Sequence, residues 1–264
     1  MRPFLLEFGG VGVGSYPFLL VAGICVLLLT SVAIAERRGL PGHHVAILVP
    51  LAYVAGLVGG RLAWVLQNRS SFADPLGALV APQPGGLTIY GGLIGGGLVA
   101  AVYAFAFRLP AARIADAAVL GLGLAAAFGR IGCFLAGCCY GRPADLPWSV
   151  VFPAGSMPAV RWGDGVPIHP SQLYEAAAFV ALAGICHRIG RRSAPAGQGF
   201  LCLVLGYSVF RFVHEFVRAD STPVFLDLTL PQWISVALAV LAGSLLANRG
   251  RQHRNGWSPT WILD

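Results

Sequence analysis

The chain has 264 residues, of which 56% are hydrophobic and only 11% are charged, and its mean hydropathy is +0.73. Soluble domains carry about 25% charged residues, so this composition excludes an ordinary soluble protein and indicates an integral membrane protein. The formal charge of +7 comes from arginines scattered between apolar segments, with no basic stripe of interleaved aromatic residues. This distribution argues against nucleic-acid binding and is typical of charges that set membrane orientation.

A membrane span needs about 20 mostly apolar residues, and seven segments of the chain approach that length. They lie at about 16–35, 44–66, 91–107, 111–128, 172–187, 199–217 and 231–247. We therefore expect an all-α integral membrane protein with about seven transmembrane helices, forming a single transmembrane domain over residues 1–264. The first segment is interpreted as a retained span, because Arg37 and Arg38 follow its apolar run, the reverse of a signal peptide.

The arginines between the spans predict the orientation. With the N-terminus outside, the inner segments hold Arg37, Arg38, Arg108, Arg113, Arg188, Arg191, Arg192, Arg249, Arg251 and Arg254, and the outer ones hold Arg2, Arg69, Arg142, Arg161 and Arg218. The excess of inner arginines favours an outer N-terminus and an inner C-terminus. The longest stretch between spans, 131–170, is then predicted to be a small extracytoplasmic head.

The sixth span, "GFLCLVLGYSVFRFVHEFVR", carries ionisable residues where a lipid-facing helix would have none. At about 100° per residue, its polar side chains fall on one stripe: Tyr207, Arg211, His214, Glu215 and Arg218. An arginine at the bilayer centre costs about 2.5–3.5 kcal/mol, so the stripe should face a partner or a wet cavity. A purely structural Arg211–Glu215 ion pair is the alternative interpretation.

Other spans add polar residues. Arg61 lies in the second span and Arg130 at the outer end of the fourth, and "HPSQLYE" opens the fifth with His169 and Glu175. Guanidinium groups bind phosphate oxygens in pairs, so an anionic lipid headgroup is a natural ligand for such arginines. Ser171 is a candidate N-cap of the fifth span.

Five glycines open the third span in "YGGLIGGG", residues 90–97. Glycines at helix interfaces let backbones approach closely, so we expect tight helix packing here. A phosphate bound at this helix N-terminus, near Tyr90, Gly91 and Gly92, is the alternative.

The stretch "GRIGCFLAGCCYG", residues 129–141, places Cys133, Cys138 and Cys139 after the fourth span. Zinc sites favour spacings such as C-x-x-C with further ligands, so this spacing predicts that no metal is bound, although His169 offers a fourth ligand. In an oxidising compartment, Cys133 paired with Cys138 or Cys139 in a disulfide is the other alternative. Cys25, Cys186 and Cys202 lie in apolar spans and are interpreted as small core residues.

Four motifs, "YGGLIGG", "GRIGCFLAGCCYG", "HPSQLYE" and "GYSVFRFVHEFVR", stand in an order that resembles bacterial prolipoprotein diacylglyceryl transferases. The resemblance covers most of the chain. It implies a transferase of the bacterial inner membrane that moves a diacylglyceryl group from phosphatidylglycerol to the lipobox cysteine thiol of preprolipoproteins. The product is a thioether, and glycerol phosphate leaves. We further expect a monomer in contact with membrane lipid, without a cofactor or nucleic acid.

The resemblance also assigns roles to residues. Arg130 and Arg211 match the principal headgroup-binding and catalytic arginines. With the residues singled out above, the candidate catalytic set is Arg130, Arg211, Tyr90 and Glu215. The candidate substrate-binding set is Tyr16, Arg61, Tyr207, Arg218, Gly91, Gly92, His169 and Glu175.

The chain departs from the family pattern at several polar positions. Tyr90 stands where the family has histidine, and Cys133, Ala136 and Cys138 replace two asparagines and a glutamate of the signature. Two alternatives therefore stand beside the main prediction. One is a divergent transferase of the same fold that moves a phospholipid-derived group to another acceptor. The other is a non-enzymatic lipid-binding membrane protein.

Overall fold

The structure is a computed structural model, and it describes residues 4–8, 11–72, 74, 77–80, 86–191, 194–219 and 221–254. Two compact units make up the chain. The first unit combines residues 1–34 with residues 115–264, and the second unit consists of residues 35–114. Each unit is described by itself.

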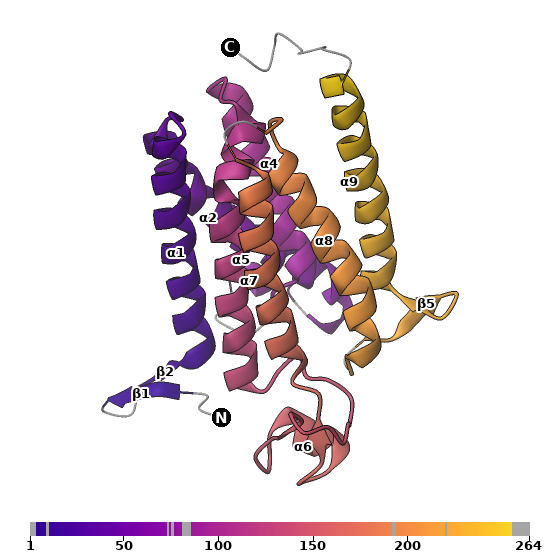
Figure 1. Ribbon diagram of the computed structural model, residues 1–264. Helices are drawn as coiled ribbons and strands as arrows, with labels where there is room; N and C mark the ends of the chain where they lie inside the picture. Colours follow the sequence, from indigo (N-terminus) through magenta and orange to yellow (C-terminus); the bar gives the residue numbers. More distant parts are fainter. Residues whose placement is uncertain are drawn as a thin grey trace. The chain divides into compact units, whose positions relative to one another are not determined.

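Seven long helices account for most of the fold (Figure 1): α1 (Ser15–Arg37), α2 (Gly42–Gln67), α4 (Ile89–Ala106), α5 (Ala111–Ala136), α7 (Ser171–Ile189), α8 (Gln198–His214) and α9 (Leu230–Arg254). Short helical segments are η1 (Arg69–Ser71), α3 (Gly77–Val80), α6 (Met157–Trp162) and η2 (Glu215–Val217). The long helices coincide with the seven apolar segments of the sequence, and the predicted all-α class is confirmed.

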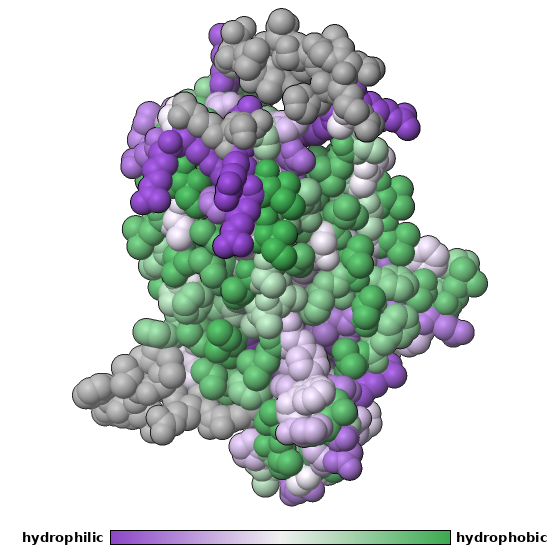
Figure 2. Space-filling view, viewed as in Figure 1, coloured by the Kyte–Doolittle hydropathy of each residue, from purple (hydrophilic) through white to green (hydrophobic). Residues whose placement is uncertain are grey.

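Six of the described helices are long and apolar enough to cross a membrane. The remaining long helix, α7, is long enough but not apolar enough, because Gln172 and Glu175 lie near one end and His187 and Arg188 near the other. Hydrophobic side chains cover much of the exposed helix surface in Figure 2, as a lipid-facing surface requires. The number of spans and their orientation stay predictions.

In the second unit, α2 and α4 lie backbone to backbone. A Cβ atom added to Gly95 would lie 2.5 Å from the carbonyl oxygen of Ala55, and one added to Gly59 would lie 2.5 Å from that of Gly91. Real Cβ atoms do not approach so closely, so only glycine fits these positions. We call Gly59, Gly91 and Gly95 the glycine seam; it confirms that "YGGLIGGG" serves close helix packing.

In the first unit, α8 packs between α7 and α9, and α5 contacts α1 and α7. The start of α8 is fixed by a buried carboxylate from α5. Asp116 accepts hydrogen bonds from the backbone N–H groups of Gly197 at 2.6 Å and Phe200 at 2.9 Å. These contacts satisfy N–H groups that the first helical turn leaves unpaired, so α5 sets where α8 begins.

Helix α5 continues through Ala136, past the predicted end of its span at 128. It ends in a Schellman motif: Gly137 has a left-handed φ of 75°, and the N–H of Cys138 donates to the carbonyl of Cys133 at 3.1 Å. Arg130 and Cys133 are therefore helical, and the irregular segment begins at Gly137.

Three small antiparallel strand pairs complete the part of the fold that the structure describes: β1 (Phe4–Phe8) with β2 (Val11–Gly14), β3 (Val150–Val151) with β4 (Pro167–Ile168), and β5 (Pro223–Phe225) with β6 (Leu228–Thr229). Between α5 and α7, the pair β3–β4 and helix α6 surround an apolar cluster of Tyr140, Phe152, Ile168 and Ala219. This cluster joins residues of the predicted head to Ala219, which follows η2. Figure 2 shows hydrophilic and hydrophobic residues mixed on the surface where Figure 1 places α6.

Candidate active site

Glu175, one turn inside α7, is the centre of a buried charge network. Its carboxylate lies 3.0 Å from the guanidinium of Arg130 and 3.6 Å from that of Arg218, and it accepts a hydrogen bond from the Tyr207 hydroxyl at 2.6 Å. Its side chain is 0% exposed. Three partners from α5, α8 and the segment after η2 therefore converge on one carboxylate.

Glu215, the first residue of η2, forms a second charged cluster beside the first. Its carboxylate lies 2.6 Å from Arg211 and 3.8 Å from Arg218, and it accepts a hydrogen bond from the Thr229 hydroxyl at 2.9 Å. Glu215 thus pairs with both Arg211 and Arg218. The structural ion pair that the sequence left as an alternative is also present, as part of this larger network.

Arg218 joins the two clusters, because it lies near both carboxylates. We call this set the charged centre: Arg130, Glu175, Tyr207, Arg211, Glu215 and Arg218. Three guanidiniums face two carboxylates, which leaves one excess positive charge. The Arg218 side chain is only 6% exposed, whereas Arg211 is 13% and Arg130 is 21% exposed. Arg130 and Arg211 are therefore the arginines that retain accessible surface for a ligand.

The sequence predicted that the polar stripe lies on one continuous helix. Instead, α8 ends at His214, η2 turns more tightly, and Arg218 has extended backbone with φ −79° and ψ 151°. This change lets Arg218 reach Glu175 while its neighbour Ala219 donates to the carbonyl of Tyr140 at 3.2 Å. His214 leaves the charged centre: its Nε2 atom lies 3.0 Å from the carbonyl of Ser171.

The loop after α5 is fastened to the start of α7. The Ser171 hydroxyl donates to the carbonyl of Cys139 at 2.8 Å, and the Gln172 amide donates to that of Cys138 at 2.7 Å. Pro170 occupies the N-cap position, so the candidate role of Ser171 as N-cap is wrong. Its hydroxyl holds the neighbouring loop instead of its own helix.

Gly141 lets this loop pass close to two other segments. A Cβ atom there would lie 2.6 Å from the Cβ of His169 and 3.0 Å from the carbonyl oxygen of Val217. Gly141 forms a β-bridge with Arg218, and the Arg142 side chain donates to the Arg218 carbonyl at 3.0 Å. The cysteine-rich loop and Arg218 are therefore positioned together.

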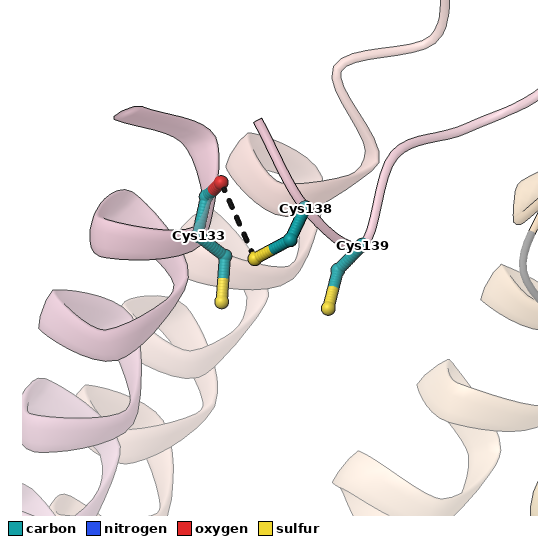
Figure 3. A group of neighbouring side chains, drawn as sticks. All are labelled: Cys133, Cys138 and Cys139. Atoms are coloured by element: carbon teal, nitrogen blue, oxygen red, sulfur yellow. Dashed lines mark hydrogen bonds between the residues drawn. The ribbon is translucent and has the colours of Figure 1, made fainter. Parts of the chain in front are cut away.

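Cys133, Cys138 and Cys139 form what we call the cysteine cluster (Figure 3), in which the sulfur atoms all lie within 4.8 Å of one another. All three are free thiols. The pKa of Cys139 lies well below the ordinary thiol value, because the neighbouring thiols of Cys133 and then Cys138 stabilise its thiolate, and Arg130 and Arg218 add to this against the effect of burial. Cys133 lowers the pKa of Cys138, but the contact with Cys139 and burial raise it by more, to about 11.

Two further candidates of the first unit lie around this centre. Tyr16, in the first turn of α1, packs against Gly132 of α5, where an added Cβ would lie 3.2 Å from the tyrosine. It lies within electrostatic range of the cysteine cluster and Arg130. His169 is turned toward Tyr174, with its Nδ1 atom 3.2 Å from the tyrosine hydroxyl.

The remaining candidates belong to the second unit. Arg61 on α2 donates to the carbonyl of Ala78 from Nη2 at 2.7 Å and from Nε at 3.2 Å, and its guanidinium lies 5.0 Å from the ring centroid of Trp64. These contacts hold α3 against α2. Tyr90, Gly91 and Gly92 lie in the first turn of α4, where Gly91 belongs to the glycine seam.

Several buried polar residues of the site were not singled out from the sequence. Thr229 binds Glu215, and Gln232 accepts from the Thr229 backbone N–H at 2.9 Å. Thr229 lies just before α9, and Gln232 lies in its first turn. The sequence shows them as polar residues at the start of that span, but only the tertiary structure brings them to Glu215.

Comparison with known proteins identifies the class. The family described as prolipoprotein diacylglyceryl transferase matches residues 3–248. Proteins named phosphatidylglycerol–prolipoprotein diacylglyceryl transferase are similar over most of their length. The one from Clostridium tetani is 28% identical, covering 95% of this chain and 98% of the relative. That from Bordetella parapertussis is 33% identical over 92% of each, and that from Geobacter sulfurreducens is 36% identical over 85% of each.

The apolar helices and the family match thus define a multi-pass membrane protein of a transferase family. The chain belongs to the prolipoprotein diacylglyceryl transferase family. The resemblance stated from four short motifs is confirmed over nearly the whole chain.

Proposed function

We propose that the protein transfers a diacylglyceryl group from phosphatidylglycerol to the lipobox cysteine thiol of preprolipoproteins. The observation that carries the proposal is the charged centre, in which three arginines and two carboxylates lie buried among apolar helices. Buried charges of this kind are costly and mark functional sites in membrane proteins. The names of the relatives supply the substrates, phosphatidylglycerol and prolipoprotein.

The charge balance of the centre suits the phosphodiester of phosphatidylglycerol. That headgroup carries one negative charge, and the centre has one excess positive charge. Arg130 and Arg211 have the most exposed side chains among the arginines of the charged centre, and guanidinium groups present paired N–H donors to phosphate oxygens. Glu175 and Glu215 act as positioning residues that hold these guanidiniums in place.

The reaction places new charge where the arginines lie. A substrate cysteine thiolate attacks the carbon of the diacylglycerol that bears the phosphate ester, a carbon–sulfur bond forms there, and the bond from that carbon to the phosphate oxygen breaks. The bonding electron pair leaves with the phosphate oxygen, so glycerol phosphate departs with one more negative charge than the diester had. Fixed cationic donors stabilise charge that develops in this way, an effect worth about 2.7–4 kcal/mol for one lost donor.

The nucleophile must lose its proton, because thiolate and not thiol is reactive. The proton passes to a base near the thiol, and Tyr90 and His169 are the candidates of this chain. Tyr16, Arg61, Tyr207, Arg218, Gly91 and Gly92 complete the proposed substrate-binding set. We place the protein in the bacterial inner membrane as a monomer, with the N-terminus and the head outside.

Complementation tests the proposal. A strain depleted of its own diacylglyceryl transferase should grow when it expresses this chain, and its preprolipoproteins should gain a diacylglyceryl thioether detectable by mass spectrometry. Detergent-purified protein should release glycerol phosphate from phosphatidylglycerol only when a lipobox peptide is present. No thioether and no glycerol phosphate, with the protein folded in the membrane, would contradict a transferase and favour lipid binding alone.

The cysteine cluster gives one reason to test a second acceptor. The family signature has polar side chains where this chain has Cys133, Ala136 and Cys138, beside Arg130. A changed surface at this position favours a transferase of the same chemistry with another thiol or amine acceptor. Release of glycerol phosphate with acceptors other than the lipobox peptide, and not with that peptide, would support this alternative.

A further inference from the structure

The cysteine cluster has no part in the proposed transfer reaction, yet its three sulfur atoms converge. The spacing Cys133-x4-Cys138-Cys139 argued against a metal site, since adjacent cysteines rarely bind one ion. In the structure Cys139 has a left-handed φ of 57°, and the cluster brings all three sulfur atoms within 4.8 Å of one another. Figure 3 shows the Cys138 sulfur directed toward Cys133, with the Cys139 sulfur beside them.

We propose that Cys133, Cys138 and Cys139 form a binding site for copper(I), held by three sulfur ligands. Metal–thiolate bonds of about 2.3 Å in a planar trigonal complex separate the sulfur atoms by about 4 Å. The cluster needs little contraction to reach that geometry. Thiolate sulfur selects soft ions such as copper(I) and zinc, so the number of ligands decides between them.

The ligand number favours copper(I) over zinc. Within the part of the chain that the structure describes, no histidine, aspartate or glutamate joins the three sulfur atoms. Structural zinc sites are almost always four-coordinate, whereas copper(I) accepts three sulfur ligands. His169, the fourth ligand that the sequence offered, is turned toward Tyr174 instead.

The surroundings of the cluster hold its geometry and place positive charge beside it. Ser171 and Gln172 bind the carbonyls of Cys139 and Cys138, which fixes the loop before any ion arrives. Copper(I) with three thiolates carries two negative charges. The guanidiniums of Arg130 and Arg218 interact electrostatically with Cys139, so positive charge lies next to the proposed ligands.

Copper(I) titration of the full-length, detergent-purified and fully reduced protein tests the proposal without reference to transferase activity. With oxygen excluded and a chromophoric chelator as competitor, we expect one copper(I) per chain. Loss of an outer-shell partner typically weakens metal binding about 10–100-fold. Cys133→Ser and Cys139→Ser remove direct ligands and should weaken copper(I) binding by more than that. Cys202→Ser, at a partly buried cysteine of α8, is the matched control and should bind as the unaltered protein does.

If a variant fails to fold, thiol protection in the unaltered protein still tests the proposal. Bound copper(I) should shield Cys133, Cys138 and Cys139 from alkylation, as read by mass spectrometry of peptides, and leave Cys25 reactive. The proposal is overturned if no single equivalent binds after reduction, or if protection falls on other cysteines. Zinc that binds as tightly as copper(I) would overturn the trigonal assignment.

Discussion

Around Glu175 and Glu215, helices meet through ionised side chains, whereas α2 and α4 meet through bare backbone. The charged centre buries five ionised groups at positions where apolar residues would cost less free energy. Replacing buried ion pairs by well-packed hydrophobic residues is often neutral or stabilising. The glycine seam carries no charge and gains stability from close packing alone. The contrast separates contacts that cost free energy to bury from contacts that pack without charge, and it agrees with the proposed role of the charged centre in the transfer reaction.

Glu175→Gln should produce the largest change. Its carboxylate is shared by Arg130, Arg218 and Tyr207, and breaking a buried pair in this way costs about 3–5 kcal/mol. We expect a clearly lower melting temperature in detergent together with loss of lipid transfer. Asp145→Asn, in the head region, is the control with the same chemical change. An unchanged melting curve for Glu175→Gln would contradict the view of Glu175 as the hub of the network.

Replacing either accessible arginine by lysine should act on activity rather than folding. Lysine keeps the charge but loses the paired donors that hold phosphate oxygens, so Arg130→Lys and Arg211→Lys should each reduce transfer by about 10²–10³-fold. The matched control is Arg161→Lys on α6, which should leave transfer unchanged. Normal turnover in both variants, measured as glycerol phosphate released, would remove these arginines from the proposed catalytic role.

Glu215→Gln separates positioning from stability. The amide can still accept the hydrogen bond of Thr229, and the partly exposed Arg211 keeps access to lipid or water, so the fold should survive. Transfer should fall by at least about tenfold, the effect of about 1.4 kcal/mol in the transition state. The measurement pairs a melting curve with a lipid-transfer assay on one preparation. A fall in both together would leave Glu215 as a structural partner of Arg211.

The smallest effects are expected in the glycine seam, where two alanine substitutions in α4 should have opposite signs. Gly95→Ala would place its Cβ 2.5 Å from the Ala55 carbonyl oxygen, so overpacking should cost about 1–3 kcal/mol. Gly97→Ala has nothing within 4 Å and should stabilise the helix by up to about 1 kcal/mol. Equal melting temperatures for the two variants would contradict the close approach of α2 and α4.

The sequence by itself determined the class of protein and the position of its helices. Seven apolar runs coincide with the seven long helices, because length and hydropathy are local properties that a chain displays directly. It also determined that Arg211, Glu215 and Tyr207 share a face, since helical periodicity fixes directions along one element. Its motifs placed the chain in its family, which the match over residues 3–248 confirmed.

Tertiary structure decided which separate elements meet. Glu175 joins Arg130 and Arg218 only because α5, α7 and the end of η2 converge, and Thr229 reaches Glu215 from the strand before α9. Arg218 reaches Glu175 because α8 ends at His214, and helical periodicity alone does not predict that end. The cysteine cluster shows the same limit: spacing along the chain argued against a shared ligand, but a left-handed turn at Cys139 and hydrogen bonds from α7 bring the three sulfur atoms together. Distances between residues of different elements depend on packing, which no local pattern encodes.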